Sequence, residues 1–135
     1  MKFNVRVLSE SDYENILVGW WRDWEWTPPV KDFLPLDGVG GLIVEWDGTP
    51  VCAGFIYNTN SKVAWIDWIV SNKNFREKPH RKDGLNLLIQ TLTDVARETK
   101  YKYVYAHNNN TNLINTFLAN GYLKGSKSTE LIKNL

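Results

Sequence analysis

The middle of the chain reads Trp65-Ile-Asp-Trp-Ile-Val-Ser-Asn72 and continues, after a basic loop, as Arg81-Lys-Asp-Gly-Leu-Asn-Leu-Leu-Ile89. The first stretch is nearly continuous in apolar residues, which indicates a strand buried on both faces of a sheet. The second stretch begins an amphipathic helix. A helix N-terminus has free N–H groups and the positive end of the helix dipole, and here cationic side chains accompany it. The pattern therefore predicts a binding site for a phosphate or pyrophosphate group.

The composition of the chain limits the classes of protein to which it can belong. Its 135 residues predict a single domain over 1–135, and shares of 43% hydrophobic and 23% charged residues are those of a globular protein. The net charge is only +1, so any basic site is local and we expect no nucleic-acid partner. No apolar run approaches the length of a membrane span, so we expect no membrane partner either.

Two residue types carry further information. Cys52 is the only cysteine, which excludes an internal disulfide and favours a reducing compartment. Because the N-terminus shows no signal-peptide pattern, we expect a cytoplasmic location. Seven tryptophans exceed the usual share and leave two interpretations open: packing, or an aromatic surface for a substrate or partner.

The pattern of the whole chain predicts elements in the order β-α-β-β-β-α-β-α-β, a mixed central sheet flanked by helices and hence an α/β (α+β) fold. Asp47-Gly48 between two apolar runs is the strongest local signal, because it suits a tight hairpin turn. Pro28-Pro29 ends the first helix, and Asn120-Gly121 ends the last one. We expect strands over 3–8, 41–46, 51–57, 63–70, 101–107 and within 129–135, and helices over 11–24, 83–99 and 113–118.

This order and its landmarks resemble the GCN5-related N-acetyltransferase (GNAT) family over essentially the whole chain, most strongly from Gly41 to Gly121. The Trp-rich first helix, the Pro-rich connection and the segment Pro50-Val-Cys-Ala-Gly-Phe55 are also similar to short GNAT-like proteins encoded by bacteriophages. The resemblance implies the acyl-CoA N-acyltransferase fold, acetyl-CoA as acyl donor, no metal, and an acceptor amine on a small molecule or peptide. For a phage-encoded protein it implies the host cytoplasm as location.

The resemblance places the acyl donor beside the C-terminal end of the fourth strand. Backbone amides there hydrogen-bond the thioester carbonyl and the pantetheine arm in the family, and Ile69, Val70 and Ser71 hold the equivalent positions. An extended arm can pair with an open strand edge as an added strand would. The alternative is that these three residues are ordinary sheet core.

The family's pyrophosphate loop reads Arg or Gln, two residues, Gly, one residue, then Gly or Ala. The segment Arg81-Lys-Asp-Gly84-Leu-Asn86 matches the Arg and the first Gly but not the last position. A second alignment takes Gly84 as the final glycine and departs from the pattern at Pro79 and Lys82. The alternative to both is a solvated basic loop. The residues that the resemblance assigns to the phosphates are Arg76, Arg81, Lys82 and Gly84.

The last helix carries a further family landmark. An Asn before this helix contacts the cofactor in the family, and a Tyr seven residues later often gives a proton to the departing thiolate. Asn110 fits the Asn, although it also suits a helix cap. Phe117 falls at the Tyr position, beside the cofactor, and has no proton to give. The remaining candidate donors are Tyr105, His107 and Tyr122.

Attack on a thioester needs a neutral amine, and a carboxylate near the middle of the fourth strand can take its proton. Asp67 is the only acid on that strand, and burial by the flanking Trp65 and Trp68 would raise its pKa toward a useful range. The alternative is that Asp67 is simply a solvent-facing or hydrogen-bonded strand residue. In that case, Glu45 on the second strand is the reserve candidate for the base. We find no spacing of His, Cys or carboxylates that predicts a metal site.

These residues together predict an acetyl-CoA-dependent N-acetyltransferase with Asp67 as catalytic base. We expect Trp24 or Trp26 to line the acceptor cleft near the end of the fourth strand, by stacking or cation–π attraction. The alternative is a non-catalytic protein of the same fold that binds coenzyme A or another protein. No motif in the sequence identifies the acceptor amine or the oligomeric state.

Overall fold

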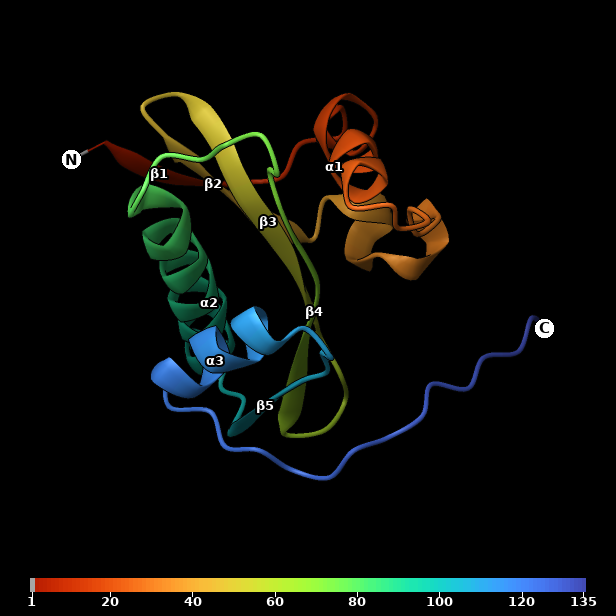
Figure 1. The fold of residues 1–135 in the computed structure, drawn as a ribbon. Coiled ribbons are helices and arrows are strands. Elements are labelled where there is room, and N and C mark those ends of the chain that lie inside the picture. Colours follow the sequence, from red (N-terminus) through yellow and green to blue (C-terminus); the bar gives the residue numbers. More distant parts are fainter. Residues whose placement is uncertain (1) are drawn as a thin grey trace.

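Five strands form one sheet in the computed structural model, which describes residues 2–135 (Figure 1). They lie in the order β1-β2-β3-β4-β5. Neighbouring strands are antiparallel from β1 to β4, whereas β4 and β5 run parallel. This confirms the predicted mixed sheet, whose strands are β1 Phe3–Val7, β2 Gly41–Trp46, β3 Thr49–Tyr57, β4 Val63–Ser71 and β5 Tyr103–Ala106.

The hairpin between β2 and β3 forms as predicted. Asp47 and Gly48 both have positive φ, 48° and 82°, as the tight two-residue turn requires. Neighbouring residues of β2 then point to opposite faces of the sheet: Ile43 packs in one core cluster and Val44 in the other. Cys52 of β3 lies in the same cluster as Val44 and is completely buried. The sheet is therefore covered on both faces.

The first face of the sheet is covered by the segment that follows β1. The predicted helix 11–24 is divided into a π-helix, η1 Tyr13–Leu17, and an α-helix, α1 Val18–Asp23. Trp20 and Trp21 of α1 pack against the sheet and are 7% and 1% exposed, so these two indoles are core residues. The two short 3₁₀ turns that follow are η2 Lys31–Phe33 and η3 Pro35–Gly38.

The opposite face is covered by two helices, α2 His80–Glu98 and α3 Thr111–Ala119 (Figure 1). α2 begins directly after Pro79, three residues before the predicted start, because proline is tolerated at a helix N-terminus. Its apolar stripe, with Leu88 and Leu92 completely buried, packs on β2, β3 and β4. Within residues 2–135, no helix combines the length and the apolar character needed to cross a membrane.

The predicted strand within 129–135 is wrong, because residues 122–135 form neither strand nor helix. Leu131 and Ile132 are 90% and 64% exposed, so their side chains pack against nothing that could hold a strand in place. Figure 1 shows this C-terminal tail as an extended chain on the side of the sheet that carries α1. The observed order is thus β-α-β-β-β-α-β-α.

Candidate functional site

β4 and β5 separate halfway along β4. Their parallel pairing ends at Ile66 and Ala106, whereas β4 continues to Ser71 with β3 as its partner on the other side. Asn72 N–H donates to the Val51 carbonyl oxygen at 2.8 Å. Because antiparallel pairs alternate, the N–H and C=O of the preceding Ser71 point away from β3. The end of β4 therefore presents backbone hydrogen-bonding groups on an edge that β5 leaves unpaired.

The other two residues predicted to meet the acyl donor are buried. Val70 faces Ala53 in the ladder, so the same alternation directs its backbone groups to β3. Its side chain is 1% exposed in the cluster under α1, and the side chain of Ile69 is 8% exposed in the cluster under α2. Both are core residues of the sheet, and a contact of either with the donor stays a prediction.

A bulge interrupts β4 at Trp68, just where β5 departs. The register with β3 shifts there, and Trp68 has φ = 55°, a conformation that bulky residues rarely adopt. The Asp67 carboxylate accepts a hydrogen bond from Trp68 N–H at 2.7 Å, and the Trp68 ring meets Trp21 edge to face at 6.3 Å between centroids. These contacts hold the strained backbone in place, and strain of this kind is concentrated at functional sites.

Asp67 is half-buried at this branch point. Desolvation by burial raises its pKa; the hydrogen bond from Trp68 N–H and the charge of His107 lower it, and the charge of Glu130 raises it again. In the part of the chain that the structure describes, no lysine or arginine forms an ion pair with Asp67. A carboxylate in such surroundings is suited to take a proton from a substrate.

Trp24 lies against the end of β4. Its indole Nε1 donates to the Ser71 carbonyl oxygen at 2.8 Å, and two cations lie over its ring, Lys73 Nζ at 5.1 Å and Arg81 Cζ at 5.3 Å from the centroid. Arg81 Nη2 also donates to Ser71 Oγ at 3.2 Å. Trp26 stacks on Trp24 and is 46% exposed. The predicted residues Trp24, Ser71 and Arg81 thus meet at one point. Lys73, from the loop after β4, joins them there without having been predicted as a site residue.

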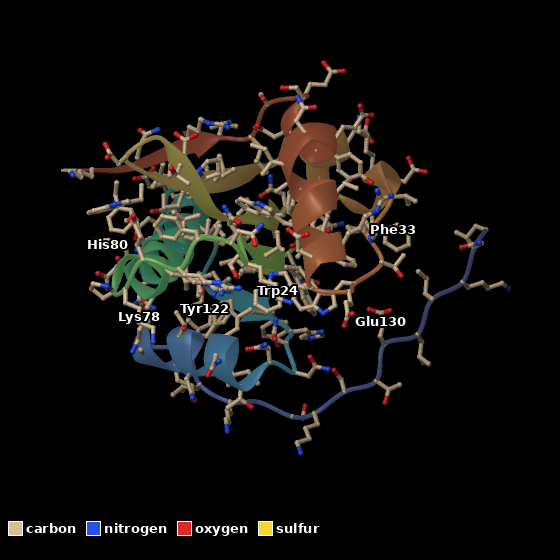
Figure 2. The ribbon with its side chains drawn as sticks, turned by 45° about the horizontal axis from the view of Figure 1, so that its top comes forward. Trp24, Phe33, Lys78, His80, Tyr122 and Glu130 are labelled. Atoms are coloured by element: carbon tan, nitrogen blue, oxygen red, sulfur yellow. The ribbon has the colours of Figure 1, made fainter. Side chains whose placement is uncertain are left out.

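An open groove of about 630 Å³ lies beside the N-terminal end of α2, where Figure 2 shows Lys78 and His80. The His80 ring stacks on Trp46 at 3.7 Å between centroids. The predicted phosphate residue Arg76 lines this groove, whereas Arg81 turns toward the end of β4. The other predicted residue, Lys82, is exposed in the first turn of α2.

Gly84 and Asn110 both have structural roles in the fold. Gly84 is buried where α2 crosses the sheet, and an added Cβ would come within 3.0 Å of Val51 Cγ1. Asn110 caps α3, because its Oδ1 accepts a hydrogen bond from Leu113 N–H at 3.0 Å. These packing and capping roles account for both residues in the fold, and a contact with the cofactor remains a prediction for each.

The candidate proton donors lie in different places. Phe117 is 6% exposed and meets Tyr122 edge to face at 4.9 Å between ring centroids. The Tyr122 hydroxyl lies 2.6 Å from Thr93 Oγ1, and burial raises the pKa of Tyr122. Tyr105 and His107 instead pack on Trp65, on the α1 side of the sheet.

The reserve base Glu45 is occupied by other contacts. Its carboxylate accepts hydrogen bonds from Asn4 at 3.1 Å and from Arg6 Nε at 3.3 Å. It therefore belongs to an ion-pair network at the opposite edge of the sheet, on β1 and β2. Among residues 2–135, no three His, Cys, Asp or Glu side chains gather closely enough to hold a metal ion.

Comparison with known proteins identifies the fold. No protein-family model and no curated protein sequence matches the chain. Glucosamine-6-phosphate N-acetyltransferase from Arabidopsis thaliana has a similar structure, with a TM-score of 0.67 and 16% identity over 99% of this chain and 100% of that one. An acetyltransferase from Trypanosoma brucei has a TM-score of 0.63 and 18% identity, over 97% of this chain and 99% of that one. N-acetylglutamate synthase from Neisseria gonorrhoeae, solved with coenzyme A and L-arginine, has a TM-score of 0.70 and 14% identity. The match covers 97% of this chain and 29% of that one. The chain therefore has the GNAT acetyltransferase fold.

Proposed function

We propose that this protein is an acetyl-CoA-dependent N-acetyltransferase. The observation that carries the proposal is the separation of β4 from β5, which leaves Ser71 N–H on an unpaired edge beside Arg81 and Lys73. An extended acyl-donor arm can hydrogen-bond such an edge as an added strand, and the cations attract its phosphates. Acetyl-CoA supplies the activated acetyl group, and the fold shared with solved acetyltransferases supports this assignment.

Asp67 is the residue to which we assign the proton transfer. In the reaction, the amine nitrogen bonds to the acetyl carbon, and the carbon–sulfur bond breaks with its electron pair staying on sulfur. The proton lost by the amine passes to Asp67, directly or through one water. The raised pKa makes this carboxylate a better base than an exposed aspartate, because burial disfavours its charged form.

The departing thiolate receives no proton from residue 117, because phenylalanine has none to give. Of the candidate donors, Tyr122 is the one that packs against Phe117, so we assign the role of proton donor to its hydroxyl. The rest of the rate enhancement in this proposal comes from holding amine and thioester together and from backbone dipoles aimed at the thioester carbonyl.

A second function is supported by the same region. Phe117 replaces the usual acid, and the Trp24 indole already occupies the Ser71 carbonyl oxygen. Both features suit a protein that binds coenzyme A without chemistry. Titration calorimetry with coenzyme A tests binding, and amine-dependent thiol release from acetyl-CoA tests chemistry. Binding without thiol release for any amine would identify the non-catalytic protein.

The decisive variant is Asp67→Asn, which keeps the shape of the side chain and removes the base. We expect kcat/KM to fall by about 10²- to 10⁴-fold. In the wild type, activity should fall as the pH drops through the raised pKa of Asp67, because only the carboxylate accepts a proton. Asp94→Asn, at an exposed position on α2, is the matched control. Full activity and an unchanged pH profile in Asp67→Asn would exclude Asp67 as the base.

A further inference from the structure

A strip of aromatic rings lies on the α1 side of the sheet, where β4 and β5 are still paired. Trp65 meets Tyr105 edge to face at 5.1 Å between centroids and His107 at 4.7 Å. Trp65 and Tyr105 face each other in the parallel ladder, so their side chains share one face. Tyr105 is 54% exposed, which leaves this aromatic strip open to solvent.

Asp67 stands at one end of the aromatic strip. It follows Trp65 by two residues on β4, so the two side chains point to the same face about 7 Å apart along the strand. The C-terminal tail adds the carboxylate of Glu130, whose charge acts on Asp67. Figure 2 shows Glu130 on the side of the sheet that carries Phe33 and Trp24. One face therefore combines two carboxylates with open aromatic rings.

Two basic side chains lie at the C-terminal end of β4, away from the aromatic strip. Arg81 and Lys73 lie over Trp24, beside Ser71. Within residues 2–135, the rings that carry a lysine or arginine of the chain itself are those of Tyr13 and Trp24. No lysine or arginine of the described residues thus lies over Trp65 or Tyr105, and the one basic ring that packs on Trp65 there is that of His107.

We infer that the acceptor is a linear aliphatic amine with a second positive charge, bound along the aromatic strip with its reacting nitrogen at Asp67. The inference rests on the proposed acetyl transfer and names its substrate class. The second ammonium group is held over Trp65 and Tyr105 by cation–π attraction and favoured by Glu130. Only the reacting nitrogen changes, losing one proton to Asp67 as it gains the acetyl group, while the second ammonium keeps its charge.

Three acceptors with four carbons each test the inference: 1,4-diaminobutane, butylamine and 4-aminobutanoate. The diamine carries two positive charges, butylamine carries one, and 4-aminobutanoate carries one positive and one negative charge. We expect kcat/KM for thiol release to be about two- to fivefold lower for butylamine than for the diamine. We expect 4-aminobutanoate to be at least about tenfold poorer than the diamine, because its carboxylate takes the place of the second ammonium group and is repelled by Glu130. Equal rates for all three, or a preference for 4-aminobutanoate, would overturn the inference while acetyl transfer stands.

Tyr105→Leu and Tyr103→Leu form a matched pair on one strand and one face, because the two tyrosines are two residues apart and both exposed. Only Tyr105 lies beside Trp65. We expect Tyr105→Leu to raise KM for the diamine about two- to fivefold, and by more than it raises KM for butylamine, and we expect Tyr103→Leu to change neither. An equal effect of both variants would refute the aromatic strip as the binding surface.

Calorimetry with 1,4-diaminobutane and protein saturated with coenzyme A separates the two proposals. Binding that weakens in Tyr105→Leu, with no thiol release from acetyl-CoA, would support the diamine site and refute the enzyme. Thiol release with other amines, and no binding of the diamine, would refute the diamine site and support the enzyme. Far-ultraviolet circular dichroism confirms that each variant is folded.

Discussion

Asp12→Asn removes the carboxylate that ties the start of the N-terminal helical segment to β1. Arg6 donates to both oxygens of Asp12 at 2.7 and 3.0 Å, and Ser9 N–H donates at 2.6 Å. The side-chain hydrogen bond from Arg6 is the main cause that lowers the pKa of Asp12 from its usual 3.8 to about 2. At about 1.4 kcal/mol per pH unit this corresponds to roughly 2 kcal/mol of folding stability. Because the Arg6 side chain is 33% exposed, solvent screening reduces the expected loss at pH 7 to about 1–2 kcal/mol.

The pH dependence gives this prediction its sign. A folded pKa below the unfolded value stabilises the protein fully above about pH 4, and the contribution disappears as the pH falls toward 2. Urea unfolding should therefore show a difference between wild type and Asp12→Asn that shrinks to about half by pH 3. Asp47→Asn, at a 70% exposed carboxylate, is the control and should stay within about 0.5 kcal/mol. A difference that is constant from pH 7 to pH 3 would refute the assignment of the stability to this ion pair.

Two predictions concern the acyl donor. We expect coenzyme A to bind with micromolar Kd, and the double variant Arg81→Ala and Lys82→Ala to weaken this binding at least about tenfold, measured by calorimetry. The charge-matched control is the double variant Lys100→Ala and Lys102→Ala. An unchanged Kd in the Arg81 and Lys82 variant would exclude a role of these two residues in binding the phosphates. We expect Phe117→Tyr to keep the fold and raise the rate of thiol release, because it supplies a proton donor; a slower rate in a folded variant would show that residue 117 does not face the leaving sulfur.

Local signals in the sequence were sufficient for most of the fold. Asp47-Gly48 marked its hairpin, and the apolar stripe of α2 marked the helix, because both depend on neighbours in the chain. The strand predicted within 129–135 failed because a short segment with a few apolar residues says nothing about a partner strand, and Leu131 is left exposed. Periodicity likewise did not show that η1 is a π-helix rather than part of an α-helix.

The candidate site was less accessible to sequence reasoning, because it is made by contacts between distant segments. The hydrogen bond from Trp24 to Ser71 joins residues 47 positions apart. The bulge at Trp68 places a bulky residue in the left-handed region, where local propensity argues against it. Asp67 could be singled out as the one acid in an apolar strand, whereas its aromatic neighbours on β5 depend on a parallel pairing that no local signal specifies.

Cys52 is unreactive toward thiol reagents as long as the protein stays folded. Its side chain is completely buried, and burial raises the pKa of the thiol, so almost no reactive thiolate is present. A disulfide reagent that detects released coenzyme A therefore records the reaction with little background from the protein. Without acetyl-CoA, the same reagent measures how often the structure opens, because Cys52 is labelled only when α2 separates from β3.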